Sequence, residues 1–118
     1  MVTYTTGDIL SSDTEAIINT VNCKGVMGAG LALQFKKKYP QNYQSYKKAC
    51  KKNTVKIGQM YVYEISDIFG RDKNPRWIIN FPTKDDWKNK SEINYIRTGL
   101  SDLRKVINQY QIKSIIYL

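Results

Sequence analysis

Three short segments carry side chains suited to catalysis or ligand binding, and the first is NFPTKDDW at residues 80–87. A lysine at a strand end, here Lys84, can be an electrophilic clamp, a general acid or base, or an imine-forming nucleophile where burial deprotonates it. Neighbouring carboxylates favour a charged amine, so a reactive amine needs Asp85 and Asp86 to point elsewhere, whereas a cationic clamp does not. Trp87 is either a packing residue or a platform on which a base stacks.

The second segment joins asparagines to a glycine-rich loop at residues 25–30. An apolar run that ends in such a loop before a helix brings backbone N–H groups and a helix N-terminus together, which favours anionic oxygens. The side chain of Asn22 offers a donor and an acceptor to sugar hydroxyls. The spacing matches neither a P-loop nor the GxGxxG fingerprint, so the loop predicts another phosphate or sugar site, or a plain tight turn.

The third segment is GDIL at residues 7–10, and it is weaker alone. The Asp8 carboxylate at a strand end could accept a hydrogen bond from an adenine amino group, but Gly-Asp is also a common turn pair. Histidine is absent and there are only two cysteines, so we expect no metal site and no cofactor. Cys23 and Cys50 are expected to be free, inert thiols.

The positive charge is concentrated in one stretch of the chain. Of the 19 lysines and arginines, nine lysines fall in residues 16–63, which hold no Asp or Glu, and this stretch accounts for the net charge of +9. If it folds onto one side, it makes a surface suited to phosphates. The alternative is that these lysines are only the solvated faces of helices.

Predicted strands and helices alternate along the chain and hold these three segments. Strands are predicted over residues 2–5, 16–21, 56–65, 76–81 and 112–118, and helices over 31–39, 40–52 and 93–110. The last helix has the clearest apolar stripe, which comprises Ile93, Ile96, Leu100, Leu103, Ile107 and Tyr110. This alternation predicts one α/β domain with helices on both faces of a mixed, largely parallel sheet.

Two further features concern where the protein works. No apolar run approaches the roughly 20 residues of a membrane span, so we expect no membrane contact. The N-terminal residues lack the basic patch and apolar stretch of a secretory signal, so we expect a cytoplasmic protein.

Taken in order, GDIL, NTVNCKGVMGAGLALQFK and NFPTKDDW resemble a macrodomain. The resemblance covers essentially the whole chain and is closest to the branch with the DarG antitoxins and the eukaryotic terminal ADP-ribose glycohydrolases. It implies a three-layer α/β/α sandwich that recognises ADP-ribose. Macrodomains follow the strand resembling residues 112–118 with a second glycine-rich loop and a closing helix, so we expect a C-terminally incomplete macrodomain.

The resemblance also implies roles for individual residues. Asp8 and Ile9 would bind adenine, Asn22 would contact the distal ribose, and Lys84 would be catalytic. The loop that would approach this ribose and the diphosphate comprises Gly28, Ala29 and Gly30.

The activity implied is that of a DNA ADP-ribosyl glycohydrolase, which frees ADP-ribose from thymidine in single-stranded DNA and acts as antitoxin to a DNA-modifying ADP-ribosyltransferase. The basic stretch and Trp87 favour a nucleic acid substrate. The alternatives are a hydrolase of ADP-ribose esters on protein carboxylates and a non-catalytic ADP-ribose-binding module.

Overall fold

The computed structural model describes residues 2–6, 13–65, 74–86 and 92–117. The strands are β1 (Thr3–Thr6), β2 (Ala16–Val21), β3 (Tyr61–Glu64), β4 (Trp77–Pro82) and β5 (Ser114–Tyr117), and the helices are α1 (Gly30–Lys38), α2 (Pro40–Lys51) and α3 (Ile93–Tyr110). None of the helices in these described ranges is long and apolar enough to cross a membrane.

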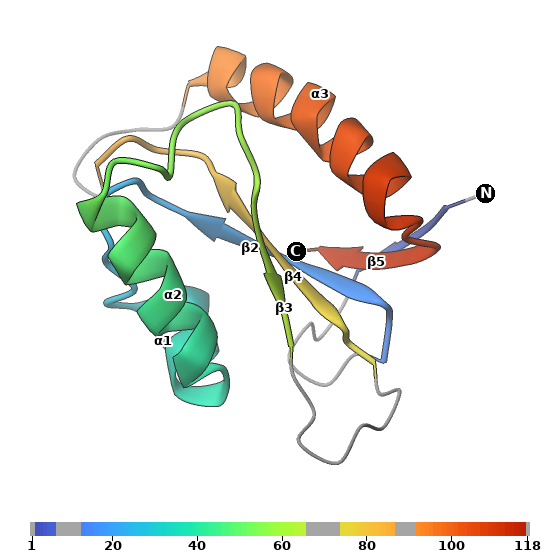
Figure 1. The fold of residues 1–118 in the computed structure, drawn as a ribbon, viewed down its shortest axis with the longest axis horizontal. Coiled ribbons are helices and arrows are strands. Elements are labelled where there is room, and N and C mark those ends of the chain that lie inside the picture. The colour runs from blue at the N-terminus through green and yellow to red at the C-terminus, as the bar shows by residue number, and fades with distance from the viewer. Residues whose placement is uncertain (1, 7–12, 66–73, 87–91, 118) are drawn as a thin grey trace.

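The strands form one sheet with the order β1-β5-β2-β4-β3. All neighbouring strands are parallel except β3, which runs antiparallel to β4 at the edge. Helices α1 and α2 lie on one face of the sheet and α3 lies on the other (Figure 1). The predicted α/β/α sandwich with a mixed, largely parallel sheet is therefore confirmed.

The central strands carry apolar residues on both faces because helices cover the sheet from both sides. Ile79 of β4 packs in the cluster that includes Leu103 and Ile107 of α3. Its neighbour Ile78 packs in a second cluster with Phe35 of α1. Successive side chains of a strand point to opposite faces, so one short run fills two cores.

Helix α3 approaches the sheet closely at Gly99, where a Cβ would lie 2.4 Å from the ring of Phe81. The predicted apolar stripe is only partly buried by the described residues. Ile93 is 67% exposed and Leu100 is 52% exposed, whereas Leu103 is buried. The helical period correctly predicted which face of α3 packs on the sheet. It did not predict how much of that face the sheet covers.

Two local features set the remaining boundaries. Pro40 occupies the first turn of α2, where its missing N–H costs no hydrogen bond, so it separates α1 from α2. Strand β3 begins only at Tyr61 rather than at residue 56, because residues 56–59 form a turn closed by a bond from the Gln59 N–H to the Lys56 carbonyl. Gly58 supports this turn with a φ of 86°.

Candidate functional site

The ends of β2 and β4 bring the two strongest sequence motifs side by side. Val21 is in register with Pro82. Beyond the strands, the N–H of Thr83 donates to the carbonyl of Val21 (3.0 Å), and the N–H of Cys23 donates to the carbonyl of Asp85 (3.0 Å). The loop that follows Val21 and the segment that carries Lys84 are therefore held together at the carboxyl edge of the sheet, where ligands of open α/β sheets bind.

A pocket of about 510 Å³ opens at this edge, and we refer to it as the site pocket. It brings together four of the predicted site residues from three segments of the chain. Gly30 is the one predicted site residue among those the structure describes that does not line this pocket. It starts α1 with a φ of 57°, and a Cβ there would meet nothing within 4 Å. The lining residues are Thr20, Val21, Asn22, Val26, Gly28, Ala29, Ala32, Thr83 and Lys84.

The amide of Asn22 holds the loop in shape. Its Oδ1 accepts hydrogen bonds from the backbone N–H groups of Lys24 (2.9 Å) and Val26 (3.3 Å), and its Nδ2 donates to the Val26 carbonyl (2.9 Å). Asn22 is 8% exposed. The amide of Asn22 therefore mainly organises the wall of the site pocket. Within the described residues, its second Nδ2 hydrogen is left for a ligand.

Two tyrosines of α2 anchor the same loop. The hydroxyl of Tyr46 is shared between the carbonyl oxygen and Oδ1 of Asn22, at 2.8 Å from each. The hydroxyl of Tyr43 donates to the carbonyl of Gly25 (3.2 Å). Tyr46 is fully buried, and this burial raises the pKa of its phenol, so it stays a neutral donor. The helical spacing of Tyr43 and Tyr46 predicts that both face inward. Their hydroxyl groups indicate that they make hydrogen bonds, but the sequence does not identify the partners.

The start of α1 adds a third element to the site pocket. Ala29 is its N-cap residue and makes no side-chain capping hydrogen bond. The first N–H groups of a helix lack partners within the helix, and the positive end of the helix dipole lies there. An anionic oxygen in the site pocket would meet these donors beside Gly28 and Ala29.

Lys84 and its acidic neighbour lie on different sides of the β4 extension. Lys84 lines the site pocket, whereas Asp85 is exposed and lines a separate hollow. For Asp85 this agrees with the condition set by the sequence for a reactive amine, and for Asp86 the condition stays a prediction. Lys84 thus faces the same space as Asn22 and the start of α1.

The cysteines behave as predicted, since both are free thiols. Burial raises the pKa of Cys23 to about 11, and the charge of Asp85 adds to this effect. Burial also raises the pKa of Cys50. Thiols with raised pKa values are poor nucleophiles near neutral pH, so neither residue is a candidate for covalent catalysis.

Three predicted site residues, Asp8, Ile9 and Trp87, lie outside the described residues. Their proposed roles with adenine and with a stacked base stay predictions. Because Thr6 at the end of β1 is in register with Tyr117 of β5, the segment that carries Asp8 follows a strand of the same parallel set.

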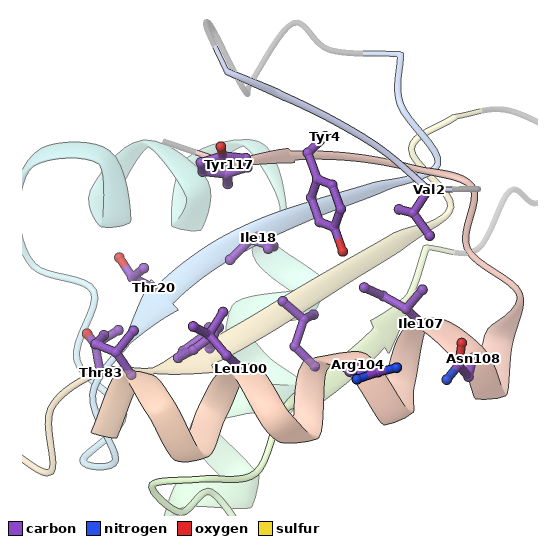
Figure 2. A pocket seen from close by; sticks show the side chains of 13 residues that line it. Val2, Tyr4, Ile18, Thr20, Thr83, Leu100, Arg104, Ile107, Asn108 and Tyr117 are labelled. Carbon is purple, nitrogen blue, oxygen red and sulfur yellow. The ribbon is translucent and has the colours of Figure 1, made fainter. Parts of the chain in front are cut away.

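A larger hollow of about 700 Å³ lies between α3 and the sheet, as Figure 2 shows. Leu100 and Ile107 of α3 face Tyr4 and Ile18 across it. The lining is mostly aliphatic and aromatic, with Arg104 and Asn108 from α3, and it shares Thr20 and Thr83 with the site pocket. The smaller site pocket is the candidate site because it brings Asn22, Lys84 and the start of α1 together, whereas the larger hollow holds none of the predicted site residues that the structure describes.

Comparison with known proteins agrees with the fold. The Macro domain family model matches residues 18–117. The DNA ADP-ribosyl glycohydrolase of Mycobacterium tuberculosis is 50% identical over 115 residues, which cover 98% of this chain and 32% of that protein. A DNA ADP-ribosyl transferase-DNA ADP-ribosyl glycohydrolase fusion protein of Thermosipho africanus is 34% identical over 116 residues, which cover 89% of this chain and 29% of that protein. The chain thus spans about a third of these relatives.

Two solved structures are also similar. The macrodomain of Mycobacterium tuberculosis DarG has a TM-score of 0.88 at 50% identity, and the match covers 99% of this chain and 74% of that chain. Thermosipho africanus DarTG in complex with ADP-ribose has a TM-score of 0.85 at 33% identity, covering 98% of this chain and 32% of that chain. With its sheet order, its site pocket and these matches, the chain belongs to the Macro domain family.

Proposed function

We propose that this macrodomain is a DNA ADP-ribosyl glycohydrolase that removes ADP-ribose from thymidine in single-stranded DNA. The observation that carries the proposal is the position of Lys84, which lines one pocket with Asn22 and the uncapped start of α1. The 50% identity to an enzyme named for this activity supports it.

In the proposed complex, the distal ribose of ADP-ribose occupies the site pocket. The free Nδ2 hydrogen of Asn22 meets a ribose hydroxyl, and the diphosphate lies against the N–H groups of the loop formed by Gly28, Ala29 and Gly30. The adenine extends toward the end of β1, where Asp8 and Ile9 follow in the sequence. This arrangement puts the anomeric carbon of the distal ribose on the side of Lys84.

The reaction breaks the bond between that anomeric carbon and a thymine nitrogen. Water supplies the hydroxyl group that ends on the carbon, and the departing nitrogen gains a proton. We assign to Lys84 the contact with this bond, where negative charge develops on the departing base. The hydrolysis needs neither a metal nor a redox cofactor for its balance.

The proposed partner is a DNA-modifying ADP-ribosyltransferase, for which this chain would act as antitoxin. Support comes from the Thermosipho africanus relative, whose name joins a DNA ADP-ribosyl transferase to a DNA ADP-ribosyl glycohydrolase. An enzyme that reverses the modification limits the damage that the transferase does. Because the proposed substrate is DNA, we propose that the protein acts in the cytoplasm, where bacterial DNA lies.

The experiment offers the protein two substrates under the same conditions, an oligonucleotide with one ADP-ribosylated thymidine and a protein with ADP-ribose esterified to glutamate. Release of free ADP-ribose is followed by mass spectrometry. We expect release from the oligonucleotide and recovery of unmodified thymidine. Release from the protein ester alone would assign the substrate to the protein class, and binding of ADP-ribose without release from either would make the chain a binding module.

A further inference from the structure

Besides the larger hollow under α3, a smaller one lies beside the site pocket, and nothing in the proposed reaction uses it. It has a volume of about 410 Å³ and takes residues from the loop after β2, the segment after α2, the segment after β4 and the start of α3. We call it the flanking hollow and define it by Lys24, Asn53, Lys56, Asp85 and Tyr95.

The flanking hollow and the site pocket share a wall. Asn22 lines the site pocket, and the next residues along the loop, Cys23 and Lys24, line the flanking hollow. On the other strand extension, Lys84 lines the site pocket and Asp85 lines the flanking hollow. The bond from the Cys23 N–H to the Asp85 carbonyl (3.0 Å) closes this wall, so the two spaces are direct neighbours.

The chemistry of the flanking hollow matches a nucleotide better than a simple anion. Lys24 and Lys56 are exposed and come from separate segments, and both line the hollow. The Asp85 carboxylate would repel a bare phosphate at close range, but it can accept hydrogen bonds from a base edge. The amide of Asn53 offers both a donor and an acceptor.

The remaining lining supplies a surface for a ring. Val55 is 4% exposed and forms an apolar part of the wall. Tyr95 is half-buried in the first turn of α3 and is the aromatic residue that lines the same hollow. Stacking on an aromatic side chain tolerates any base, which suits a strand recognised without regard to its sequence.

We propose that the flanking hollow binds the nucleotide next to the modified thymidine, with Lys24 and Lys56 on its phosphates and Tyr95 against its base. This inference rests on the proposed DNA substrate and extends it to a second binding site. One strand then crosses the shared wall, with ADP-ribose in the site pocket and the neighbouring nucleotide in the flanking hollow. Specificity for a DNA strand over a free nucleoside would arise here rather than at Lys84.

The test measures the binding of unmodified single-stranded DNA by fluorescence anisotropy at several salt concentrations. The variant is Lys24→Ala/Lys56→Ala, and the matched control is Lys105→Ala/Lys113→Ala. The control removes the same charge from exposed positions at the end of α3 and before β5, away from the carboxyl edge of the sheet. Tyr95→Ala and Tyr95→Phe form a second pair, in which only phenylalanine keeps the stacking surface.

We expect the Lys24→Ala/Lys56→Ala variant to weaken DNA binding about tenfold and to lower the salt slope of log K by about 1.4, at about 0.7 for each lost phosphate contact. The control should keep both the affinity and the slope. Tyr95→Ala should weaken binding about tenfold and Tyr95→Phe should not. Equal losses in variant and control, no loss in either, or no DNA binding by the parent protein would overturn the inference.

A second readout separates this inference from the proposed function. Hydrolysis is compared on a modified oligonucleotide and on ADP-ribosylated thymidine as a single nucleoside. The Lys24→Ala/Lys56→Ala variant should raise the KM for the oligonucleotide about tenfold and leave the nucleoside reaction and the Kd for ADP-ribose unchanged. If the parent protein binds DNA through these lysines but hydrolyses neither substrate, the proposed function fails and the binding site stands.

Discussion

The hydroxyl of Tyr46 on α2 lies 2.8 Å from both the carbonyl oxygen and the Oδ1 of Asn22 at the end of β2. A fully buried helix residue thereby fixes the backbone and the side chain of the residue that shapes the site pocket. The site pocket is therefore organised from the helical layer behind it as well as from the sheet edge.

Replacing Tyr46 by phenylalanine tests this relationship, because the change removes only the hydroxyl. The two Asn22 oxygens lose a buried donor, so we expect a loss of about 1–2 kcal/mol in the free energy of unfolding. We also expect weaker ADP-ribose binding, measured by calorimetry. The control is Tyr63→Phe, because the Tyr63 hydroxyl makes a long bond of 3.4 Å to Gln41 away from the site pocket. Unchanged ADP-ribose affinity in Tyr46→Phe would remove Tyr46 from the organisation of the site.

Gly28→Ala should separate binding from stability. A Cβ at Gly28 would meet only Cγ1 of Val26, at 3.6 Å, which is an ordinary contact. We therefore expect a stability change below about 0.5 kcal/mol, as for surface substitutions that break no special feature. Gly28 lines the site pocket, so the added methyl group should raise the Kd for ADP-ribose about tenfold. A normal Kd at normal stability would mean that the ligand does not approach this loop.

Gly99→Ala should act in the opposite way, on stability alone. Its Cβ would lie 2.4 Å from the Phe81 ring, so either α3 or the ring must move. We expect a loss of about 1–3 kcal/mol in denaturant unfolding, which is the usual cost of overpacking. Phe81→Leu in the same chain should recover part of this loss by making room. A Gly99→Ala variant as stable as the parent protein would show that α3 does not pack this closely on β4.

The pKa of Cys23 predicts slow alkylation. Its pKa of about 11, against a usual 9.0, leaves about 100-fold less thiolate at pH 8. Iodoacetamide should thus label Cys23 in the folded protein about 100-fold more slowly than in the unfolded protein, as followed by mass spectrometry. The folded state holds this proton to a higher pH than the unfolded state does, so stability should fall as the pH rises from about 9 to about 11. Rapid labelling at pH 8 would contradict the burial of this thiol.

The sequence predicted the fold through its apolar periodicity. Strand β2 begins and ends where the sequence places it, because Ala16 to Val21 is rich in β-branched residues and is buried along most of its length. The start of α2 follows from Pro40, whose chemistry permits a helix to begin and not to continue. The grouping of Asn22, Gly28 and Lys84 also follows, since parallel strands end at one edge.

Long-range polar contacts were beyond the reach of the sequence. Asn80 of β4 bonds to Asn42 of α2 (2.9 Å) and accepts from Asn19 of β2 (3.1 Å), and all three are buried. Periodicity shows that such residues face inward, but it does not show which partners their amides meet. The same holds for Tyr46 and Asn22, which are 24 positions apart in the chain.

The catalytic role of Lys84 is tested by the rate at which the Lys84→Ala variant releases ADP-ribose from an oligonucleotide with ADP-ribosylated thymidine. Lys84→Arg, which keeps a positive charge but changes its geometry, is measured beside it. We expect Lys84→Ala to lower kcat at least about 100-fold while the Kd for ADP-ribose stays within about threefold of the parent value, since removing one preorganised group costs about 10²–10³ in rate. A Lys84→Ala variant that folds, binds ADP-ribose and releases it from DNA at the parent rate would show that Lys84 has no part in the reaction.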